Sequence, residues 1–159
     1  MYILYTDKTY NFDHYVMTTE QKFLFLTVNA CKDVYIFLSH LPAVLDGNAY
    51  HILIGSSGNS RSSITKMPPD SQTQDFDTPN ILSCSDSGSQ IWISWSTGRI
   101  QVGFGTDIQQ NLKFEWTDPQ PISINAFSLS SRDDKVVRWT FLRDSGKLCI
   151  CYKRLKHVP

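Results

Sequence analysis

The chain has 159 residues and a mass of 18.2 kDa, which is long enough to bury a hydrophobic core without several disulfides or a structural metal. Its 15 basic and 15 acidic residues cancel, so the charge balance gives no reason to expect nucleic acid as a partner. No apolar run approaches the roughly 20 residues of a membrane span, and the N-terminus lacks the pattern of a signal peptide. We therefore expect no transmembrane segment and a soluble protein, either cytoplasmic or secreted after processing.

The first half of the chain is typical of short β-strands separated by turns. Residues 23–30 and 34–39 are rich in aromatic and β-branched side chains, and we expect them to form a strand pair around the turn at 31–33. Residues 68–79 contain three prolines and no periodicity, which favours an irregular surface loop. Further strands are predicted over residues 50–55, 61–67 and 80–84.

The most regular pattern spans residues 91–105 and predicts a β-hairpin. Large and small side chains alternate on both sides of a Ser-Thr-Gly turn, in which Gly98 can adopt a positive φ without strain. Trp92 and Trp95 differ by an odd number of positions, so we expect them on opposite faces of the sheet, with at least one near a surface or a bulge. We interpret this hairpin as the central scaffold of the fold.

The rest of the chain continues in the same way, with strands predicted over residues 111–116, 122–130, 136–142 and 148–153. About ten or more short strands, with little or no helix, predict an all-β protein with the fold of an antiparallel β-sandwich or jelly roll. We expect a single β-sandwich domain over residues 1–159. Its parts are N-terminal strands in 1–21, a core in 22–142, and a C-terminal strand and tail in 143–159.

The four cysteines, Cys31, Cys84, Cys149 and Cys151, do not have the spacing of a zinc site. Cys149 and Cys151 are two positions apart on a predicted strand, so they share a face and cannot easily bond to each other. Buried free thiols are the simpler interpretation of the cysteines. One disulfide in an oxidising compartment is the alternative.

The sequence contains no recognisable constellation for catalysis. Its four histidines are scattered, and none stands at metal-ligand spacing with another histidine, a cysteine or a carboxylate. No Gly-x-Ser-x-Gly elbow is present. His51 alternates with Tyr50 and Ile52 in a predicted strand, which favours a surface or hydrogen-bonded core histidine over a general base. We therefore predict no catalytic residue, no metal site and no cofactor.

Several blocks of the chain form a recognisable series: residues 50–55, 58–62, 78–82, 92–95 with 98–103, and 114–119. In this order they resemble the invertebrate farnesoic acid O-methyltransferase-like domain. The resemblance extends from about Phe23 to Phe141 and implies methyl transfer from S-adenosylmethionine to farnesoic acid, a juvenile-hormone precursor. The family pattern has a Gly-Trp pair where Ser56 and Ser57 stand here, and a Gly- and Trp-rich loop at residues 130–135, so this chain replaces aromatic groups with hydroxyl and charged ones.

A methyltransferase of the common kind needs a Gly-rich turn that opens a helix and holds the polar end of the cofactor. The nearest candidate is the Gly-x-Gly formed by Gly103 and Gly105, which follows a predicted strand. It lacks a third glycine, and the residues after it are too few and too poorly patterned for the required helix. We interpret these glycines as hairpin-end residues, with a cofactor loop as the alternative.

A polar turn between two predicted strands is one candidate for a binding site. Ser57, Asn59 and Arg61 offer hydroxyl, amide and guanidinium groups on a turn where Gly58 lets the backbone approach a ligand. An Asx turn formed by Asn59 is the structural alternative. We predict these three residues as ligand-binding.

A second group of candidates lies after two later strands. Asp118 beside Trp116 places a carboxylate next to an aromatic plane, a combination that suits a sugar. The alternative is an Asx turn at Asp118 and a core position for Trp116. Arg132 and Asp133 lie in a charged tip, which is most simply a solvated hairpin turn and alternatively the rim of a site.

From loop composition and the resemblance we predict a non-catalytic, lectin-like module that binds carbohydrate or another small ligand. A homo-oligomer would raise a weak affinity per site through multivalency. The first alternative is an S-adenosylmethionine-dependent farnesoic acid O-methyltransferase. The second is a protein-interaction module that uses an exposed sheet edge or the loop at 68–79.

Overall fold

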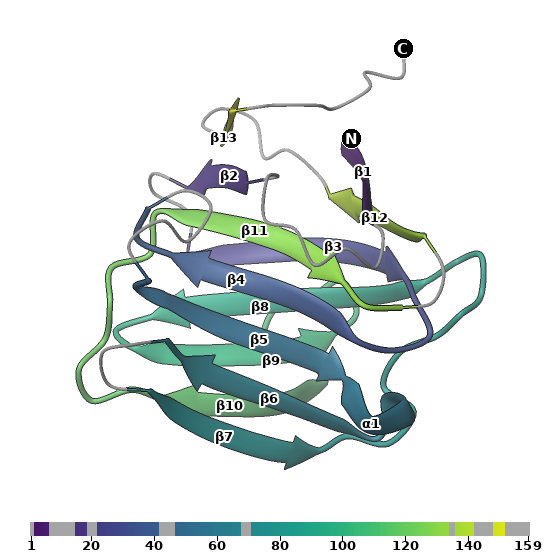
Figure 1. Ribbon diagram of the computed structural model, residues 1–159, viewed down its shortest axis with the longest axis horizontal. Helices are drawn as coiled ribbons and strands as arrows, with labels where there is room; N and C mark the ends of the chain where they lie inside the picture. The colour runs from purple at the N-terminus through teal and green to yellow at the C-terminus, as the bar shows by residue number, and fades with distance from the viewer. Residues whose placement is uncertain are drawn as a thin grey trace.

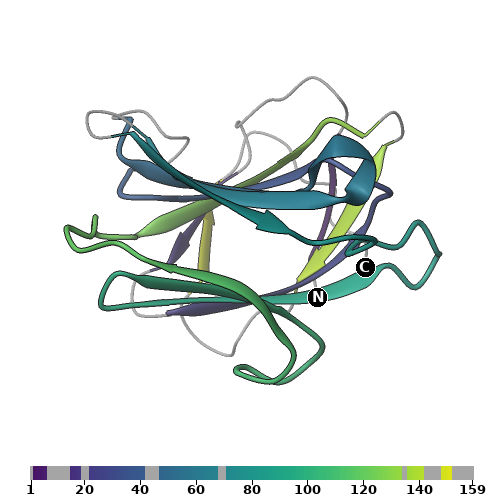
Figure 2. The ribbon, with the colours of Figure 1, turned by 90° about the horizontal axis from the view of Figure 1, so that it is seen from below.

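A computed structural model describes the chain over residues 2–6, 15–18, 22–41, 47–67, 71–133, 136–141 and 148–151. Within these residues it contains thirteen strands and one helical turn, α1 (Ser56–Asn59). The strands form two antiparallel sheets that lie face to face (Figures 1 and 2). The predicted all-β antiparallel sandwich is therefore confirmed. No helix in the described part of the chain is long and apolar enough to cross a membrane.

The sheets, which we call A and B, have the strand orders β1-β12-β3-β8-β9-β10 and β13-β2-β11-β4-β5-β6-β7. Sheet A consists of β1 (Tyr2–Thr6), β3 (Phe23–Asn29), β8 (Ser89–Ser96), β9 (Arg99–Phe104), β10 (Leu112–Thr117) and β12 (Val137–Phe141). Sheet B consists of β2 (Tyr15–Thr18), β4 (Val34–Ser39), β5 (Ala49–Gly55), β6 (Arg61–Lys66), β7 (Gln72–Asp77), β11 (Ala126–Ser131) and β13 (Leu148–Cys151). β1 pairs with β12 in sheet A and β2 pairs with β13 in sheet B, so each sheet joins strands from the two ends of the chain.

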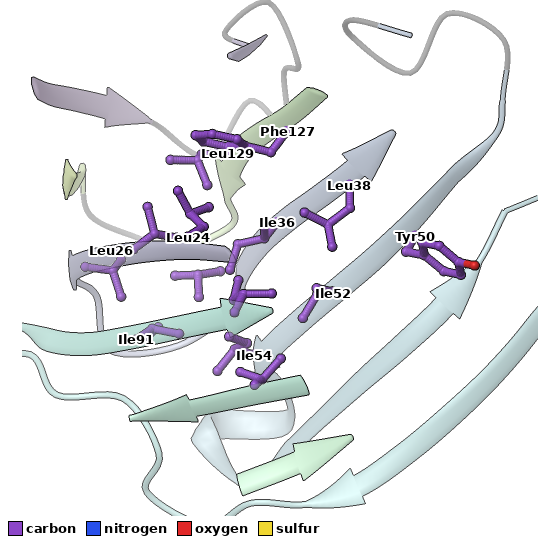
Figure 3. Close-up of a cluster of buried hydrophobic side chains, with 14 of the residues drawn as sticks. Leu24, Leu26, Ile36, Leu38, Tyr50, Ile52, Ile54, Ile91, Phe127 and Leu129 are labelled. Carbon is purple, nitrogen blue, oxygen red and sulfur yellow. The ribbon is translucent and has the colours of Figure 1, made fainter. Parts of the chain in front are cut away.

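The hydrophobic core lies between the sheets and follows from strand alternation. In β3, Leu24, Leu26 and Val28 are buried, whereas the residues between them are only half-buried. β4 is buried along its whole length. Figure 3 shows side chains from both sheets meeting in this core. The cluster includes Leu24, Leu26, Ile36, Leu38, Tyr50, Ile52, Ile54, Ile91, Phe127 and Leu129.

The strands on either side of residues 31–33 are present, but the prediction that they pair with each other is wrong. β3 belongs to sheet A and β4 to sheet B, so the connection crosses between the sheets. Asp33 has a φ of 49°, and its backbone N–H donates to the carbonyl of Gly55 in sheet B at 3.2 Å. Two apolar strands joined by a short turn can form an arch between two sheets or a hairpin within one sheet. The sequence pattern of residues 23–39 is the same for both and does not distinguish them.

The predictions for residues 68–84 also need correction. The expected irregular loop contains β7, the edge strand of sheet B, which pairs with β6 at six register positions. Five of the six residues of β7 are exposed, so the strand has no buried face that alternation would reveal. Residues 80–84 are described and form no strand; in this segment the Asn59 side chain bonds to both the N–H and the carbonyl of Leu82. Residues 68–70 lie outside the described part.

Trp92 and Trp95 point to opposite faces of β8, as predicted. Trp95 joins the core between the sheets. Trp92 lies on the outer side of sheet A, is nevertheless fully buried, and donates its indole N–H to the carbonyl of Gln110 at 2.9 Å. Gly103 stands opposite Trp92 in the register of β8 and β9, and a Cβ at Gly103 would overlap the indole ring. Gly103 is therefore required by packing.

We expect Gly103→Ala to lower the free energy of unfolding by about 1–3 kcal/mol, because the added methyl group forces the Trp92 ring to move. Urea denaturation measures this loss. The double variant Gly103→Ala/Trp92→Leu relieves the overlap and should be less destabilised than the sum of its single changes. An unchanged urea midpoint for Gly103→Ala would contradict the packing assignment.

Cys31 and Cys84 form a disulfide, with their Cα atoms 4.6 Å apart. For this pair the disulfide, and not the pair of free thiols, is therefore the correct interpretation. The bond joins the arch after β3 to the loop before β8 across a sequence separation of 53 residues. The side chains of Cys149 and Cys151 lie outside the described part of the structure.

Removing this disulfide should destabilise the fold by about 4 kcal/mol, the chain-entropy value for a loop of this length. We expect a reductant to lower the denaturation midpoint of the wild-type chain toward that of Cys31→Ala/Cys84→Ala. The reductant should leave the double variant itself unchanged. Equal midpoints for the wild type with and without reductant would show that the bond contributes nothing.

Candidate functional site

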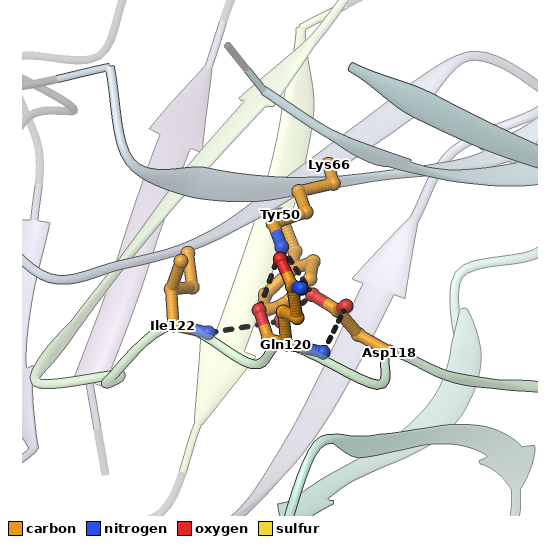
Figure 4. A network of polar contacts seen from close by, with 5 residues as sticks. All are labelled: Tyr50, Lys66, Asp118, Gln120 and Ile122. Carbon is orange, nitrogen blue, oxygen red and sulfur yellow. Dashed lines mark hydrogen bonds and ion pairs between the residues drawn. The ribbon is translucent and has the colours of Figure 1, made fainter. Parts of the chain in front are cut away.

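A buried ion pair lies at one end of the sandwich, where β10 leads into the loop at 118–125. The Lys66 Nζ, at the end of β6, is 2.8 Å from the Asp118 Oδ2, and the two side chains are only 7% and 1% exposed. The Tyr50 hydroxyl donates to the same carboxylate oxygen at 2.7 Å (Figure 4). The pair therefore links sheet B to the chain that leaves sheet A.

The backbone of the following loop completes this network. The Gln120 N–H donates to the other Asp118 oxygen at 2.9 Å, and the Gln120 carbonyl accepts from the Lys66 ammonium at 2.6 Å. The Ile122 N–H donates to the Tyr50 oxygen at 3.2 Å. The Asx turn that was the alternative interpretation of Asp118 is thus present. Because both oxygens of the Asp118 carboxylate bond to groups of the protein, this side chain holds the loop at 118–125 in place.

Burial and hydrogen bonding fix the protonation of this network. Burial alone would raise the pKa of the Asp118 carboxyl, but hydrogen bonds from Lys66, Tyr50 and Gln120 outweigh it and hold that pKa below its ordinary value. Burial, followed by the hydrogen bond to Asp118, raises the pKa of the Tyr50 hydroxyl. At neutral pH Asp118 is therefore a permanent acceptor and Tyr50 a permanent donor.

A cavity of about 410 Å³ opens beside the network, and Tyr50 belongs to both. This volume lies within the roughly 300–1,000 Å³ of small-ligand sites. The buried part of its lining is Tyr50, Trp95, Ile100 and Ile124, and five other lining residues are exposed. We call it the end cavity; its full lining is Lys22, Tyr50, Trp95, Ser96, Thr97, Gly98, Ile100, Pro121, Ile122, Ser123 and Ile124.

One side of the end cavity is the predicted turn between β8 and β9. Thr97 and Gly98 both have positive φ, at 50° and 81°, as a two-residue hairpin turn of the I′ type requires. The Asp118 N–H donates to the Gly98 carbonyl at 2.9 Å and so ties the turn to the opposite loop. A Cβ at Gly98 would come within 2.6 Å of the Asp118 carbonyl oxygen, so glycine is also needed for this close approach.

The chemical groups around the end cavity suit binding. The indole nitrogen of Trp95 is buried and donates no hydrogen bond in the structure. Ser96, Thr97 and Ser123 add hydroxyl groups, and Lys22 adds an ammonium group. None of the eleven lining residues, all of which are described, is an aspartate or a glutamate. The cavity therefore combines apolar and aromatic walls with hydrogen-bonding groups and lacks a carboxyl acid–base pair.

The seven predicted ligand-binding residues fall at two ends of the sandwich. Trp116 and Asp118 lie behind the end cavity: Trp116 packs nearly perpendicular to Tyr50, with ring centroids 5.9 Å apart. Neither residue lines the cavity. Tyr50, the second residue of β5, contacts Asp118, and β5 ends at Gly55, so the turn that follows the strand lies at the far end of the molecule (Figure 1).

At that far end, Ser57 and Asn59 belong to α1, and Arg61 begins β6. The Asn59 amide is used in its two bonds to Leu82. Arg61 lies 3.6 Å from Asp77 in an exposed ion pair, and the Ser57 carbonyl accepts from the Ser60 hydroxyl at 2.8 Å. The role of these residues in binding a ligand stays a prediction.

Arg132 and Asp133 lie at the same far end, after β11. Asp133 is 3% exposed, and its carboxylate accepts from the backbone N–H of Cys31 at 2.6 Å and more distantly from that of Lys32. The Arg132 N–H donates to the Asp33 carbonyl at 2.9 Å. Asp133 therefore stabilises the arch between the sheets beside the disulfide.

His51 lies on the outer face of sheet B, stacked between two aromatic rings. Its ring centroid is 5.1 Å from that of Tyr35 and 4.6 Å from that of Phe37, with nearly parallel planes. Burial, with a contribution from the charge of Arg132, lowers the pKa of His51 to about 4. A neutral, stacked histidine agrees with a structural role better than with a base poised near neutral pH.

Sequence reasoning missed the four residues that define the end cavity and its support, which are Lys22, Tyr50, Lys66 and Trp95. Lys66 carried a usable signal. In β6 the buried residues alternate as Ser62, Ile64 and Lys66, and a lysine on the buried side of an alternating strand requires a charged partner. The other three come from separate strands or strand ends and meet only in the fold.

Comparison with known families supports the resemblance seen in the sequence. The model of the farnesoic acid O-methyltransferase family matches residues 6–144, which is most of the chain. The chain belongs to this family. The match extends beyond the region from about Phe23 to Phe141 that the sequence motifs covered.

The similar proteins of known sequence or structure are remote. A BTB/POZ domain-containing protein of Arabidopsis thaliana is 35% identical over 89 residues, which is 55% of this chain and 11% of that protein. A β-1,3-1,4-glucanase from a mouse hindgut metagenome superposes with a TM-score of 0.51 at 8% identity, covering 87% of this chain and 77% of the enzyme. The VIP36 lumenal domain, bound to Ca²⁺ and mannose, gives a TM-score of 0.42 at 11% identity and covers 98% and 81%. The glucanase likeness concerns the fold alone.

We expect Asp118→Asn to lower the free energy of unfolding by about 3–5 kcal/mol, because it leaves the Lys66 charge buried without a counter-ion. Folding lowers the pKa of Asp118, so the wild type loses part of its stability as the pH falls below the ordinary aspartate pKa of about 3.9. The variant has no carboxyl group at this position and should not show this pH-dependent loss. Denaturant titrations over a series of pH values measure both effects.

The matched control is Glu115→Gln, which removes the exposed ion pair between Arg99 and Glu115 (2.7 Å, side chains 52% and 37% exposed). This change should cost less than about 1 kcal/mol. If the two variants lose equal stability, the buried pair has no special role.

Proposed function

We propose that this member of the family is a non-catalytic carbohydrate-binding module and that the end cavity is its binding site. The observation that supports this most is the end cavity itself, in which Tyr50 and Trp95 line an aromatic wall and Ser96, Thr97 and Ser123 supply hydroxyl groups. A sugar presents a C–H face, which packs on an aromatic ring, and hydroxyl groups, which need polar partners. Both kinds of partner are present here within one cavity.

The lining of the end cavity argues against glycoside hydrolysis. That reaction uses a pair of carboxyl groups on either side of the scissile bond. None of the lining residues supplies one, and the neighbouring carboxylate of Asp118 is 1% exposed and bound to Lys66 and Tyr50. The fold shared with a glucanase therefore does not carry that enzyme's reaction to this chain.

Methyl transfer, which the family description suggests, is the second candidate function. The Gly-x-Gly considered as its cofactor loop has structural duties instead: Gly103 makes room for Trp92, and the Gly105 N–H donates to the Gln90 carbonyl at 3.0 Å. If this candidate is right, calorimetry will detect S-adenosylmethionine binding to the folded chain. No heat at millimolar cofactor would remove it.

A protein-interaction role, including self-association, has one observation in its favour. Among the described strands, β7 is an exposed edge strand with one unpaired side; it carries Asp75 and Asp77 but contains neither lysine nor proline to discourage pairing with another chain. Pairing of two copies along β7 would bring two end cavities into one particle and raise a weak affinity through multivalency. Light scattering of the wild type and of Thr73→Pro tests this homo-oligomer proposal.

The proposed function predicts that the folded chain binds at least one glycan above background on a glycan array. For that glycan, Trp95→Phe should weaken binding by roughly tenfold, because the smaller ring changes the aromatic wall of the end cavity. Isothermal titration calorimetry with the selected glycan measures the change.

The matched control is Trp92→Phe, which alters the same strand on its opposite face, away from the end cavity. It should leave glycan affinity unchanged while losing some stability with the bond to Gln110. Equal losses of affinity in the two variants would place the binding site elsewhere. A folded protein that retains no glycan would refute the proposed function.

A further inference from the structure

We propose that the ligand of the end cavity is an acidic sugar, one whose carboxylate binds the ammonium group of Lys22. A uronic acid or an oligosaccharide that contains one has this chemistry. The inference rests on the proposed carbohydrate-binding function and narrows it to one class of sugar.

The position of Lys22 supports this role. Lys22 directly precedes β3, and its carbonyl accepts from the Trp95 N–H at 2.8 Å, so its backbone is fixed against the strand that carries the aromatic wall. The side chain is exposed at the edge of the end cavity. Within the described part of the structure, its ammonium group makes no ion pair or hydrogen bond. An exposed, unpaired cation at the mouth of a cavity attracts an anion.

The charge balance of the end cavity supports an anionic ligand in the same way. Lys22 is the charged member of its lining, and the lining has no carboxylate to compensate it. The Asp118 carboxylate behind Tyr50 is neutralised at 2.8 Å by Lys66, which is itself buried. The cavity therefore presents one uncompensated positive charge, which matches a ligand with one negative charge.

The donors and hydroxyl groups around that charge favour a sugar acid over other anions. Lysine is a point charge that binds carboxylate and phosphate groups alike, but one lysine balances the single charge of a carboxylate and only part of the charge of a phosphate monoester. Ser96, Thr97 and Ser123 offer partners for several hydroxyl groups. A purely apolar carboxylic acid would use Lys22 and leave those hydroxyl groups unmatched.

The test is calorimetric titration of the folded chain with matched pairs of oligosaccharides: oligogalacturonate, its methyl ester, and the neutral galactose oligomer. We expect the acid to bind about fivefold more tightly than its ester at low salt, with the preference shrinking as salt is added. Lys22→Gln should remove this preference and leave the affinity for the ester unchanged. Lys113→Gln, an exposed lysine of β10 outside the end cavity, should change neither.

Each other outcome overturns the inference in a recognisable way. Equal binding of acid and ester, or a preference that survives Lys22→Gln, refutes the acidic-sugar proposal while carbohydrate binding stands. If acid, ester and neutral oligomers all fail to bind and the glycan array is also empty, both the acidic-sugar proposal and the proposed carbohydrate-binding function are refuted. Binding of farnesoic acid in place of every sugar, abolished by Lys22→Gln, would show an apolar carboxylic acid in the cavity and would also refute both.

Discussion

The ion pair between Lys66 and Asp118 is the interaction on which this end of the molecule depends. Two charges removed from water are favourable together only when their geometry is good and their other hydrogen bonds are made. Here the Tyr50 hydroxyl and the backbone of Gln120 supply those bonds. Because Lys66 and Tyr50 belong to sheet B and Asp118 follows the last strand of one edge of sheet A, the same contacts set the distance between the sheets and the path of the loop that borders the end cavity.

The two ends of the sandwich are stabilised differently, and this difference decides where a ligand finds room. At the far end, a disulfide joins Cys31 to Cys84. The side chains of Asn59 and Asp133 form hydrogen bonds with the backbone of loops there. Their hydrogen-bonding capacity is largely used to hold the chain. At the other end the polar network is placed behind Tyr50, and a cavity remains in front of it. Trp95 lines that cavity.

The sequence predicted the fold class because strand alternation and turn residues are local signals. The opposite faces of Trp92 and Trp95 and the turn at Gly98 were predictable for the same reason. Pairing between strands is not local: β3 and β4 are neighbours in the chain and lie in different sheets, and β7 is held by backbone bonds with hardly any burial. The candidate site escaped prediction in the same way. The polar composition of a loop does not show which side chains bond within the protein, as Asn59 does, and which face a cavity, as Lys22 does.

In the proposed site, the residues that hold the loop in place differ from those that contact the ligand. Variants at the two kinds of position must therefore be interpreted differently. Asp118 is 3% exposed and lies behind Tyr50, so a change there reaches a ligand only by moving the loop at 118–122, and it must lower stability as well as affinity. Lys22 is exposed, and in the described part of the structure its carbonyl is the group that bonds, so under the proposed function a change of its side chain alters affinity without disturbing the fold. Loss of binding without loss of stability therefore identifies a contact residue. Loss of both, as at Asp118, says nothing about contact and is not a sign that the carboxylate touches sugar.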